Sequence, residues 1–112
     1  QELATARQQK IRLETVLPHY REQDKAYEQL VKKGFAGTLM GSDKRRERIE
    51  KEQELATQEH VIASAQASIE QSHKKLRQIE ADYQRNLHAE RNEVQSQLDK
   101  LAAELEKQQH RH

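Results

Sequence analysis

The sequence predicts an all-α fold: a long antiparallel coiled-coil helical hairpin with unequal arms, the first of them broken near Pro18. Three observations lead to this prediction. Charged residues make up 35% of the 112 residues and hydrophobic residues 33%, which leaves little apolar area for a globular core. All three glycines fall between Gly34 and Gly41. Elsewhere, apart from Pro18, the chain consists of helix formers whose apolar members recur every seven residues, as in a coiled coil.

The first arm is expected over residues 1–33. Its apolar residues step by seven, with a second row beside the first: Ala6, Leu13, Tyr20 and Tyr27, then Leu3, Leu17 and Val31. Pro18 has no amide hydrogen to donate, and its ring clashes with the carbonyl four residues back. The arm should therefore kink or break briefly at residues 17–18, which would split it into residues 1–16 and 18–33.

The turn is expected at residues 34–42, because the glycines gather there. Gly34 follows two lysines and suits a left-handed cap at the end of the first helix. Ser42 is a suitable first cap for the second arm, and Asp43 places a carboxylate in its first turn. The second, longer arm is expected over residues 43–110.

The seam between the arms is expected to combine the heptad residues of both. Its predicted members are Leu13, Leu17, Tyr20, Tyr27, Leu55, Ile62, Ile69 and Leu76. From Leu76 onward the steps alternate between seven and four, which is an eleven-residue repeat with a period of about 3.67 residues per turn.

The apolar stripe beyond the seam is expected to need a partner. A turn centred near Thr38 would place residue 1 opposite residue 75, so the rest of the second arm would lie unpaired. The stripe consists of Leu76, Ile79, Tyr83, Leu87, Val94, Leu98, Leu101 and Leu105. Exposed stripes of this length are usually covered. We expect an upstream segment to cover it in a longer parent protein, and a second copy to pair with residues 76–105 in this chain.

Several functions are disfavoured by the same composition. The net charge of +1 and the short basic run Lys44–Arg48 argue against nucleic-acid binding, and solvation of a helix start explains that run better. No apolar run approaches the roughly 20 residues that span a bilayer. Cysteine is absent, and the six histidines lack the spacing of metal ligands, so neither a metal nor a cofactor is expected: His19, His60, His73, His88, His110 and His112. No catalytic constellation is visible, and we expect no enzyme.

The turn is the most informative segment, since an inert helix connection needs only two to five polar residues. Apolar residues gather in and beside it: Leu30, Val31, Phe35, Ala36, Gly37, Thr38, Leu39 and Met40. We expect these to dock on a partner, with plugging of the seam's end by Phe35 and Leu39 as the alternative. Nearby basic residues would steer the turn toward acidic groups: Lys32, Lys33, Lys44, Arg45 and Arg46.

The segment around the turn resembles one family. The run Leu17-Pro18-His19-Tyr20-Arg21-Glu22-Gln23 and the run from Tyr27 to Gly37, followed by a Glu/Gln/Lys-rich helix, look like the hairpin of the hemolysin-D family. These proteins are periplasmic adaptors, or membrane fusion proteins, of type I secretion systems. Related adaptors carry an Arg, three residues, Leu, six residues, Ser pattern at the tip. Here Leu30 matches, whereas Ala26 and Gly37 replace the arginine and serine.

The resemblance implies a function in protein export. The tip would dock on a TolC-like outer membrane channel, and absent domains would engage an inner membrane ABC transporter. The parent would be anchored in the inner membrane, lie in the periplasm and assemble as a ring, with no membrane insertion of this segment. A coiled-coil dimerisation scaffold without a transport function is the alternative, and a helical nucleic-acid binder is a remoter one.

Overall fold

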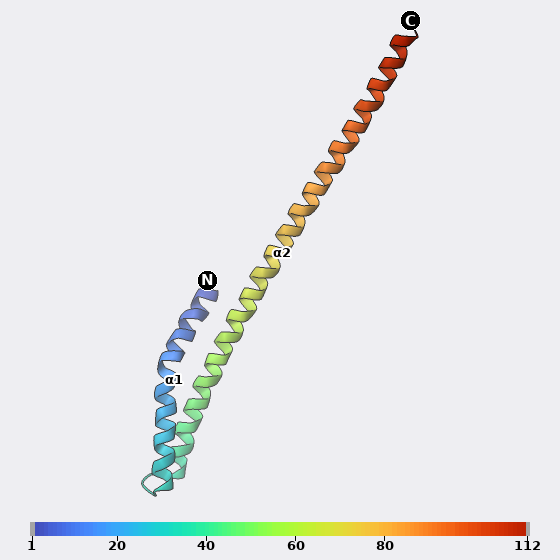
Figure 1. The fold of residues 1–112 in the computed structure, drawn as a ribbon. Helices are drawn as coiled ribbons and strands as arrows, with labels where there is room; N and C mark the ends of the chain where they lie inside the picture. Colours follow the sequence, from blue (N-terminus) through green and yellow to red (C-terminus); the bar gives the residue numbers. More distant parts are fainter. Residues whose placement is uncertain (1, 112) are drawn as a thin grey trace. The chain divides into compact units, whose positions relative to one another are not determined.

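The computed structural model describes residues 2–111, which form two helices joined by a turn (Figure 1). Helix α1 spans Glu2–Lys32 and helix α2 spans Thr38–His110. The predicted all-α helical hairpin with unequal arms is therefore confirmed. Within the described part of the chain, no helix is both long and apolar enough to cross a membrane.

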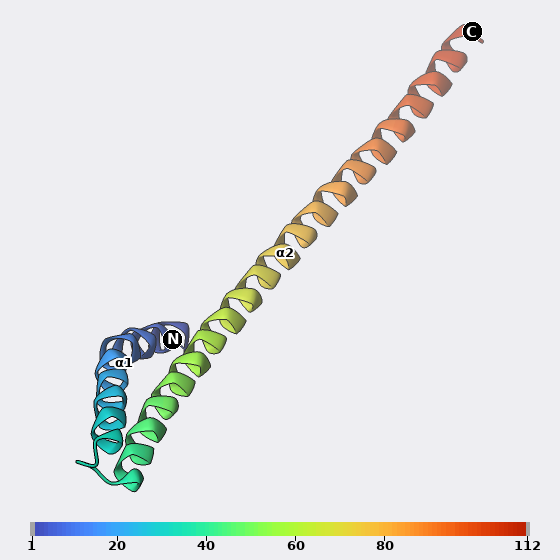
Figure 2. The same ribbon diagram turned by 60° about the horizontal axis from the view of Figure 1, so that its bottom comes forward.

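The chain divides into two units, and α2 contributes to both. Residues Gln1–Ile69 form the first unit, in which α1 lies against the first part of α2 in both views (Figures 1 and 2). Residues Glu70–His112 form the second, in which α2 continues as far as His110.

Pro18 does not interrupt the first helix, so of the two expected outcomes, a kink or a short break, the break is wrong. Helix α1 is continuous through Pro18. Figure 2 shows that α1 bends in its N-terminal half, which agrees with the expected kink. Pro18 cannot donate a hydrogen bond to the carbonyl of Glu14, and Leu13 and Leu17 beside that site are both buried. Their packing against α2 holds the backbone helical at a site that proline alone would destabilise.

The seam of the hairpin follows a strict alternation of three- and four-residue steps on both helices, which is the heptad pattern of a coiled coil. Its α1 members are Leu3, Ala6, Lys10, Leu13, Leu17, Tyr20, Asp24, Tyr27 and Val31. Its α2 members are Gly41, Lys44, Arg48, Lys51, Leu55, Gln58, Ile62 and Ala65. All of these residues are buried or half-buried. The seam predictions for Leu13, Leu17, Tyr20, Tyr27, Leu55 and Ile62 are therefore confirmed.

The seam changes character along its length. Away from the turn it is mainly apolar, with Lys10 and Gln58 as its polar members, and the three buried residues of the described chain lie there: Ala6, Leu13 and Leu17, at 2%, 5% and 3% exposure. Toward the turn, Asp24 on α1 and three cationic residues on α2 take the positions where leucine or isoleucine is usual. This half of the hairpin must therefore be held by charge and aromatic contacts.

An ion-pair network joins the two helices in the polar half. Arg48 Nε donates to Asp24 Oδ2 across the seam at 2.6 Å, and Arg48 Nη1 donates to Glu52 Oε1 at 2.9 Å. Arg21 Nε on α1 lies 3.5 Å from the same Glu52 oxygen, which adds a second link between the helices. The side chains of Asp24 and Arg48 are only 14% and 26% exposed, so their attraction is screened less than that of surface pairs.

Two cation–π contacts flank this network. Lys44 Nζ lies 5.4 Å from the centre of the Tyr27 ring, and Lys51 Nζ lies 5.7 Å from that of Tyr20. Each pair joins a seam residue of α1 to one of α2. The lysine ammonium groups are attracted to the faces of the tyrosine rings, and the methylene chains of the lysines cover apolar surface.

These cross-seam pairs fix a register that differs from the predicted one. With Asp24 opposite Arg48 and Tyr27 opposite Lys44, the start of α1 reaches residues 60–69 of α2, where Glu2 shares a groove with Ala65 and Ile69. Ile69 is 47% exposed, and Leu76, in the second unit, is 63% exposed. Their predicted place in the seam is therefore wrong. The shift arises because the turn is shorter than the sequence suggested.

The stability of the hairpin should depend on the ionisation of Glu52. Hydrogen bonding from Arg48, then its charge and the contact with Arg21, hold the pKa of Glu52 below its ordinary 4.5. The folded state thus favours the carboxylate. Its contribution is complete above pH 4.5 and is lost as the pH falls through the lowered pKa, because the unfolded chain takes up the proton first.

We expect Glu52→Gln to flatten the loss of stability between about pH 6 and pH 3, measured by chemical unfolding. Tyrosine signals in a Tyr83→Phe background would report on the hairpin, where the other two tyrosines, Tyr20 and Tyr27, both lie in the seam. Glu59→Gln is the control, because Glu59 is exposed and takes part in no ion pair among residues 2–111. Equal pH profiles for wild type and Glu52→Gln would contradict the assignment.

Candidate partner-binding surface

The turn between the helices is a five-residue connection, Lys33–Gly37, closed by backbone hydrogen bonds. Phe35 N donates to Leu30 O at 2.8 Å, and Gly34 N donates to Val31 O at 3.1 Å. This pair of bonds is a Schellman motif, which satisfies the last carbonyls of α1. Gly34 has a φ of 79°, in the left-handed region that the motif requires, so its predicted capping conformation is confirmed.

Helix α2 begins earlier than predicted. Residues 38–42, assigned to the turn from the sequence, are helical, so neither Ser42 nor Asp43 marks the start. Gly37 takes the cap position instead, since its carbonyl accepts the first helical bond from Gly41 N at 3.2 Å. Glycine is tolerated at a helix N-cap, although it supplies no side-chain acceptor.

Gly41 lies inside α2 because the two helices approach closely there. A β-carbon built on Gly41 would lie 2.9 Å from Val31 Cγ2, which is shorter than carbon atoms allow. Val31 is β-branched and stiff, so it cannot turn away freely. Val31 and Gly41 therefore close the turn end of the seam, in place of Phe35 and Leu39, for which that function was the alternative expectation.

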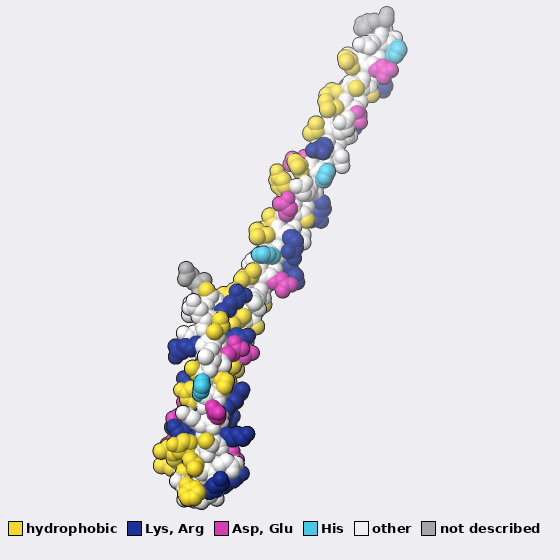
Figure 3. All heavy atoms as spheres, turned by 60° about the vertical axis from the view of Figure 1, so that its left-hand side comes forward, with side chains coloured by type: hydrophobic (Ala, Val, Ile, Leu, Met, Phe, Trp, Pro, Cys, Tyr) yellow, Lys and Arg dark blue, Asp and Glu magenta, His cyan; other side chains and the backbone are white. Residues whose placement is uncertain are grey.

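Four large apolar side chains remain exposed around the turn, and we call them the turn surface: Leu30, Phe35, Leu39 and Met40. Phe35 and Leu39 are 79% and 78% exposed, so neither plugs the seam. Met40 and Leu30 are 46% and 37% exposed. Figure 3 shows hydrophobic side chains gathered at the turn end of the hairpin. Among the other predicted docking residues, Val31 and Ala36 are half-buried, while Gly37 and Thr38 are exposed.

The predicted steering cations are only partly available. Lys44 lies in the seam over Tyr27, with Nζ 3.6 Å from Glu47 Oε2, so its assignment to steering is wrong. Lys32 lies 3.5 Å from Glu28, and Arg46 lies between Asp43 and Glu50 at 3.4 and 3.8 Å. Lys33 and Arg45 are exposed. The positive field at the turn therefore comes mainly from those two residues.

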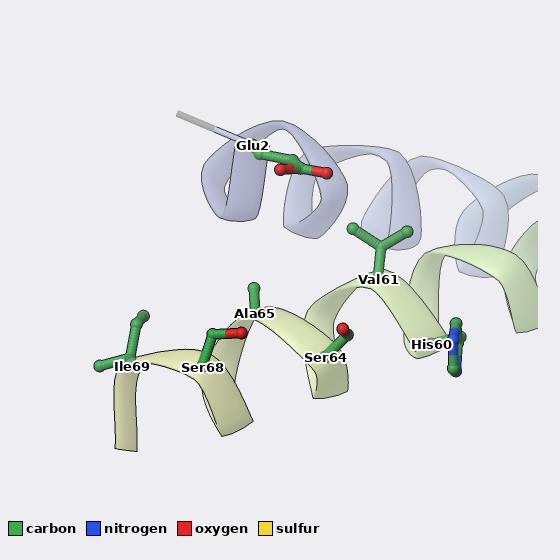
Figure 4. Close-up of a pocket in the computed structure, with 7 residues that line it drawn as sticks. All are labelled: Glu2, His60, Val61, Ser64, Ala65, Ser68 and Ile69. Atoms are coloured by element: carbon green, nitrogen blue, oxygen red, sulfur yellow. The ribbon is translucent and has the colours of Figure 1, made fainter. Parts of the chain in front are cut away.

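A second surface feature of the hairpin is a shallow groove where α1 begins (Figure 4). It is lined by Glu2 from α1 and by residues of α2: His60, Val61, Ser64, Ala65, Ser68 and Ile69. Small residues on α2 leave room for the bent start of α1. A single carboxylate beside exposed hydroxyls provides neither a nucleophile with its base nor a set of metal ligands.

The described histidines do not gather into a site. His19, His60, His73, His88 and His110 are all exposed, and His112 lies outside the described residues. Residues 2–111 hold no group of three histidine, aspartate or glutamate side chains that could bind a metal ion. The turn surface is thus the strongest candidate for function within the hairpin.

Sequence reasoning missed the polar seam. Arg48 was assigned to a solvated helix start and Asp24 was not assigned, yet they form the closest contact between the helices that involves charge. The signal was present in the spacing: Asp24 follows Tyr20 by four residues and precedes Tyr27 by three, so it occupies a seam position.

Comparison with known proteins returned no match to a family model, to a curated protein or to a solved structure. Function must therefore be inferred from the residues and from the geometry of the two units.

The contact between Gly41 and Val31 can be tested by a double-mutant cycle. Replacing a helical glycine by alanine normally stabilises a protein by about 1 kcal/mol. We expect Gly41→Ala to give no such gain, because the added carbon meets Val31. In a Val31→Ala background the gain should return. Chemical unfolding of the four proteins measures both effects, and an equal effect of Gly41→Ala in the two backgrounds would show that the helices do not approach closely here.

Proposed function

We propose that this chain is a partner-binding helical hairpin of a type I secretion adaptor, and that its turn surface docks on a TolC-like outer membrane channel. The observation that carries the proposal is that Phe35 and Leu39 are 79% and 78% exposed. Both lie at a turn whose backbone is held by its own hydrogen bonds. A turn built only to connect two helices would not need them.

Burial against a partner would make these side chains favourable. Moving a phenylalanine or leucine side chain from water into an apolar contact contributes about 1.5–3 kcal/mol. The closed turn presents Phe35 on a backbone that is already ordered, so little conformational entropy is lost on binding. The turn surface therefore has the features of a compact binding hot spot: apolar anchors on a rigid support.

The choice of an adaptor rests on the resemblance of residues 17–40 to the hemolysin-D family. The hairpin architecture is compatible with it, and so is a binding surface at the turn. Leu30, the matching residue of the tip pattern, belongs to the turn surface, whereas the substituted positions Ala26 and Gly37 are exposed without large side chains. Contact with the channel would therefore be mainly apolar, with Lys33 and Arg45 adding electrostatic attraction.

In this proposal the chain acts by binding and not by chemistry. The parent adaptor would be anchored in the inner membrane, lie in the periplasm and assemble as a ring, and its other domains would engage an ABC transporter. A coiled-coil scaffold without a transport function is the second candidate, favoured by the exposed apolar stripe of residues 76–105. The scaffold would bind no channel through its turn.

Capture of a purified TolC-like channel by the immobilised chain tests the proposal. We expect Phe35→Asp combined with Leu39→Asp to reduce capture at least about tenfold, because two apolar anchors are lost and two carboxylates enter the interface. Both positions are highly exposed, so the hairpin should stay folded, which circular dichroism checks.

Ile11→Asp is the matched control. Ile11 is 64% exposed on α1, so the change also removes an exposed apolar side chain and adds a carboxylate, but outside the turn. It should leave capture unchanged. Equal capture by wild type and the turn variant would remove the turn surface from the mechanism, and no capture by wild type would favour the scaffold.

A further inference from the structure

The second unit carries an apolar stripe that no part of residues 2–111 covers. Its members, which we call the C-terminal stripe, are Leu76, Ile79, Tyr83, Leu87, Val94, Leu98, Leu101 and Leu105, each between 40% and 64% exposed. Figure 3 shows hydrophobic side chains lined up along one side of this part of α2. An occupant of the stripe must match both its apolar spacing and the charges that interrupt it.

The order of residues along the stripe is nearly the same in both directions. About a centre between Glu90 and Arg91, Leu87 mirrors Val94, Tyr83 mirrors Leu98, and Leu76 mirrors Leu105. Ile79 and Leu101 fall in matching layers, one residue from perfect symmetry. The eleven-residue repeat explains the match, because reversing such a repeat about its midpoint returns the same spacing. A surface of this kind is complementary to itself about a two-fold axis.

We propose that the C-terminal stripe pairs with the same stripe of a second copy of this chain, antiparallel, with the two-fold axis between Glu90 and Arg91. Six of the eight stripe residues then meet a stripe residue of the other copy: Leu76 with Leu105, Tyr83 with Leu98, and Leu87 with Val94. The paired segment would be about 43 Å long at 1.5 Å per residue.

Charge at the centre selects this arrangement. Glu90 and Arg91 interrupt the stripe, and both line a shallow groove with Leu87 and Val94. Neither takes part in an ion pair among the described residues. In the antiparallel pair Glu90 of each copy meets Arg91 of the other. In a parallel pair in register, glutamate would meet glutamate and arginine would meet arginine, which is destabilising.

The residues that flank the stripe agree with the same choice. Lys75 mirrors Glu106, so the ends of an antiparallel pair carry opposite charges. Arg77 mirrors Glu104 in the same way, and two further flanking pairs are uncharged amides: Asn86 with Gln95, and Gln84 with Gln97. A parallel pair would again bring Lys75 to Lys75 and Glu106 to Glu106. A charged pair at one layer of an apolar seam is also a known means of setting register.

This inference does not depend on the proposed function, because it uses only residues of the second unit. Its failure would leave the turn surface untouched. It specifies the second copy as the occupant of the stripe, and a different occupant would appear in the experiment as a chain that stays monomeric.

Sedimentation velocity on the intact chain and on charge variants tests whether Glu90 and Arg91 hold the two copies together. We expect the wild type to form dimers, and Arg91→Glu to weaken association at least about tenfold, because both central positions of each copy are then acidic and repel those of the other copy. Glu90→Arg should do the same. Mixing the two variants should restore dimers, since one copy then carries two arginines at the centre and the other two glutamates.

Arg85→Glu is the matched control for Arg91→Glu. Arg85 lies two residues before Leu87 and nine before Val94, so at about 100° per residue it faces away from the stripe. It should leave association within about twofold of wild type. An equal loss for Arg85→Glu and Arg91→Glu would overturn the register, and so would a monomeric wild type.

Disulfide crosslinking fixes the direction of the pair, since the natural chain has no cysteine. Tyr83→Cys mixed with Leu98→Cys should oxidise mainly to the mixed disulfide. Tyr83→Cys alone should stay uncrosslinked, because in the antiparallel pair its two copies lie about 22 Å apart along the axis and a disulfide needs α-carbons within about 7 Å. Efficient crosslinking of Tyr83→Cys alone would show a parallel pair and contradict the proposal.

Discussion

The ion pair between Asp24 and Arg48 is the interaction on which the hairpin depends. The seam around Leu17 would tolerate a slip of one heptad, because this leucine would meet Ile62 in place of Leu55. Asp24 does not have that freedom. Its carboxylate is largely shielded from water and must lie opposite a cation, and Arg48 Nε provides one at 2.6 Å. The pair thereby sets which residues meet along the whole hairpin.

The register, in turn, determines what happens at the turn. With Asp24 opposite Arg48, Val31 comes against Gly41, and only five residues remain to connect the helices. The three glycines serve three separate purposes: Gly34 adopts the left-handed cap, Gly37 begins α2, and Gly41 admits Val31. Because Val31 closes the end of the seam, Phe35 and Leu39 are left outside it. The exposed turn surface is thus a consequence of the polar seam.

The helices and most of the seam could be predicted from residue spacing, because a seven-residue repeat of apolar side chains admits few other folds. The errors share a cause. Pro18 and Gly41 were assigned from local propensity, and in both places packing between the helices overrides it: buried leucines carry α1 through Pro18, and close contact requires Gly41 within α2. The polar seam was missed because charged residues were assumed to lie on the surface. The exposure of the turn surface depends on the contact between Val31 and Gly41, which residue spacing alone does not predict.

The most direct test of the register is a double-mutant cycle across the seam, with Asp24→Asn, Arg48→Gln and the two together, read by chemical unfolding in the Tyr83→Phe background. Each single change removes the attraction and leaves its partner charged in a shielded position. If the pair holds the hairpin in register, the double variant should lose clearly less stability than the sum of the two single losses. Strictly additive losses would contradict this, because they would show that Asp24 and Arg48 do not depend on each other and that the register is set elsewhere.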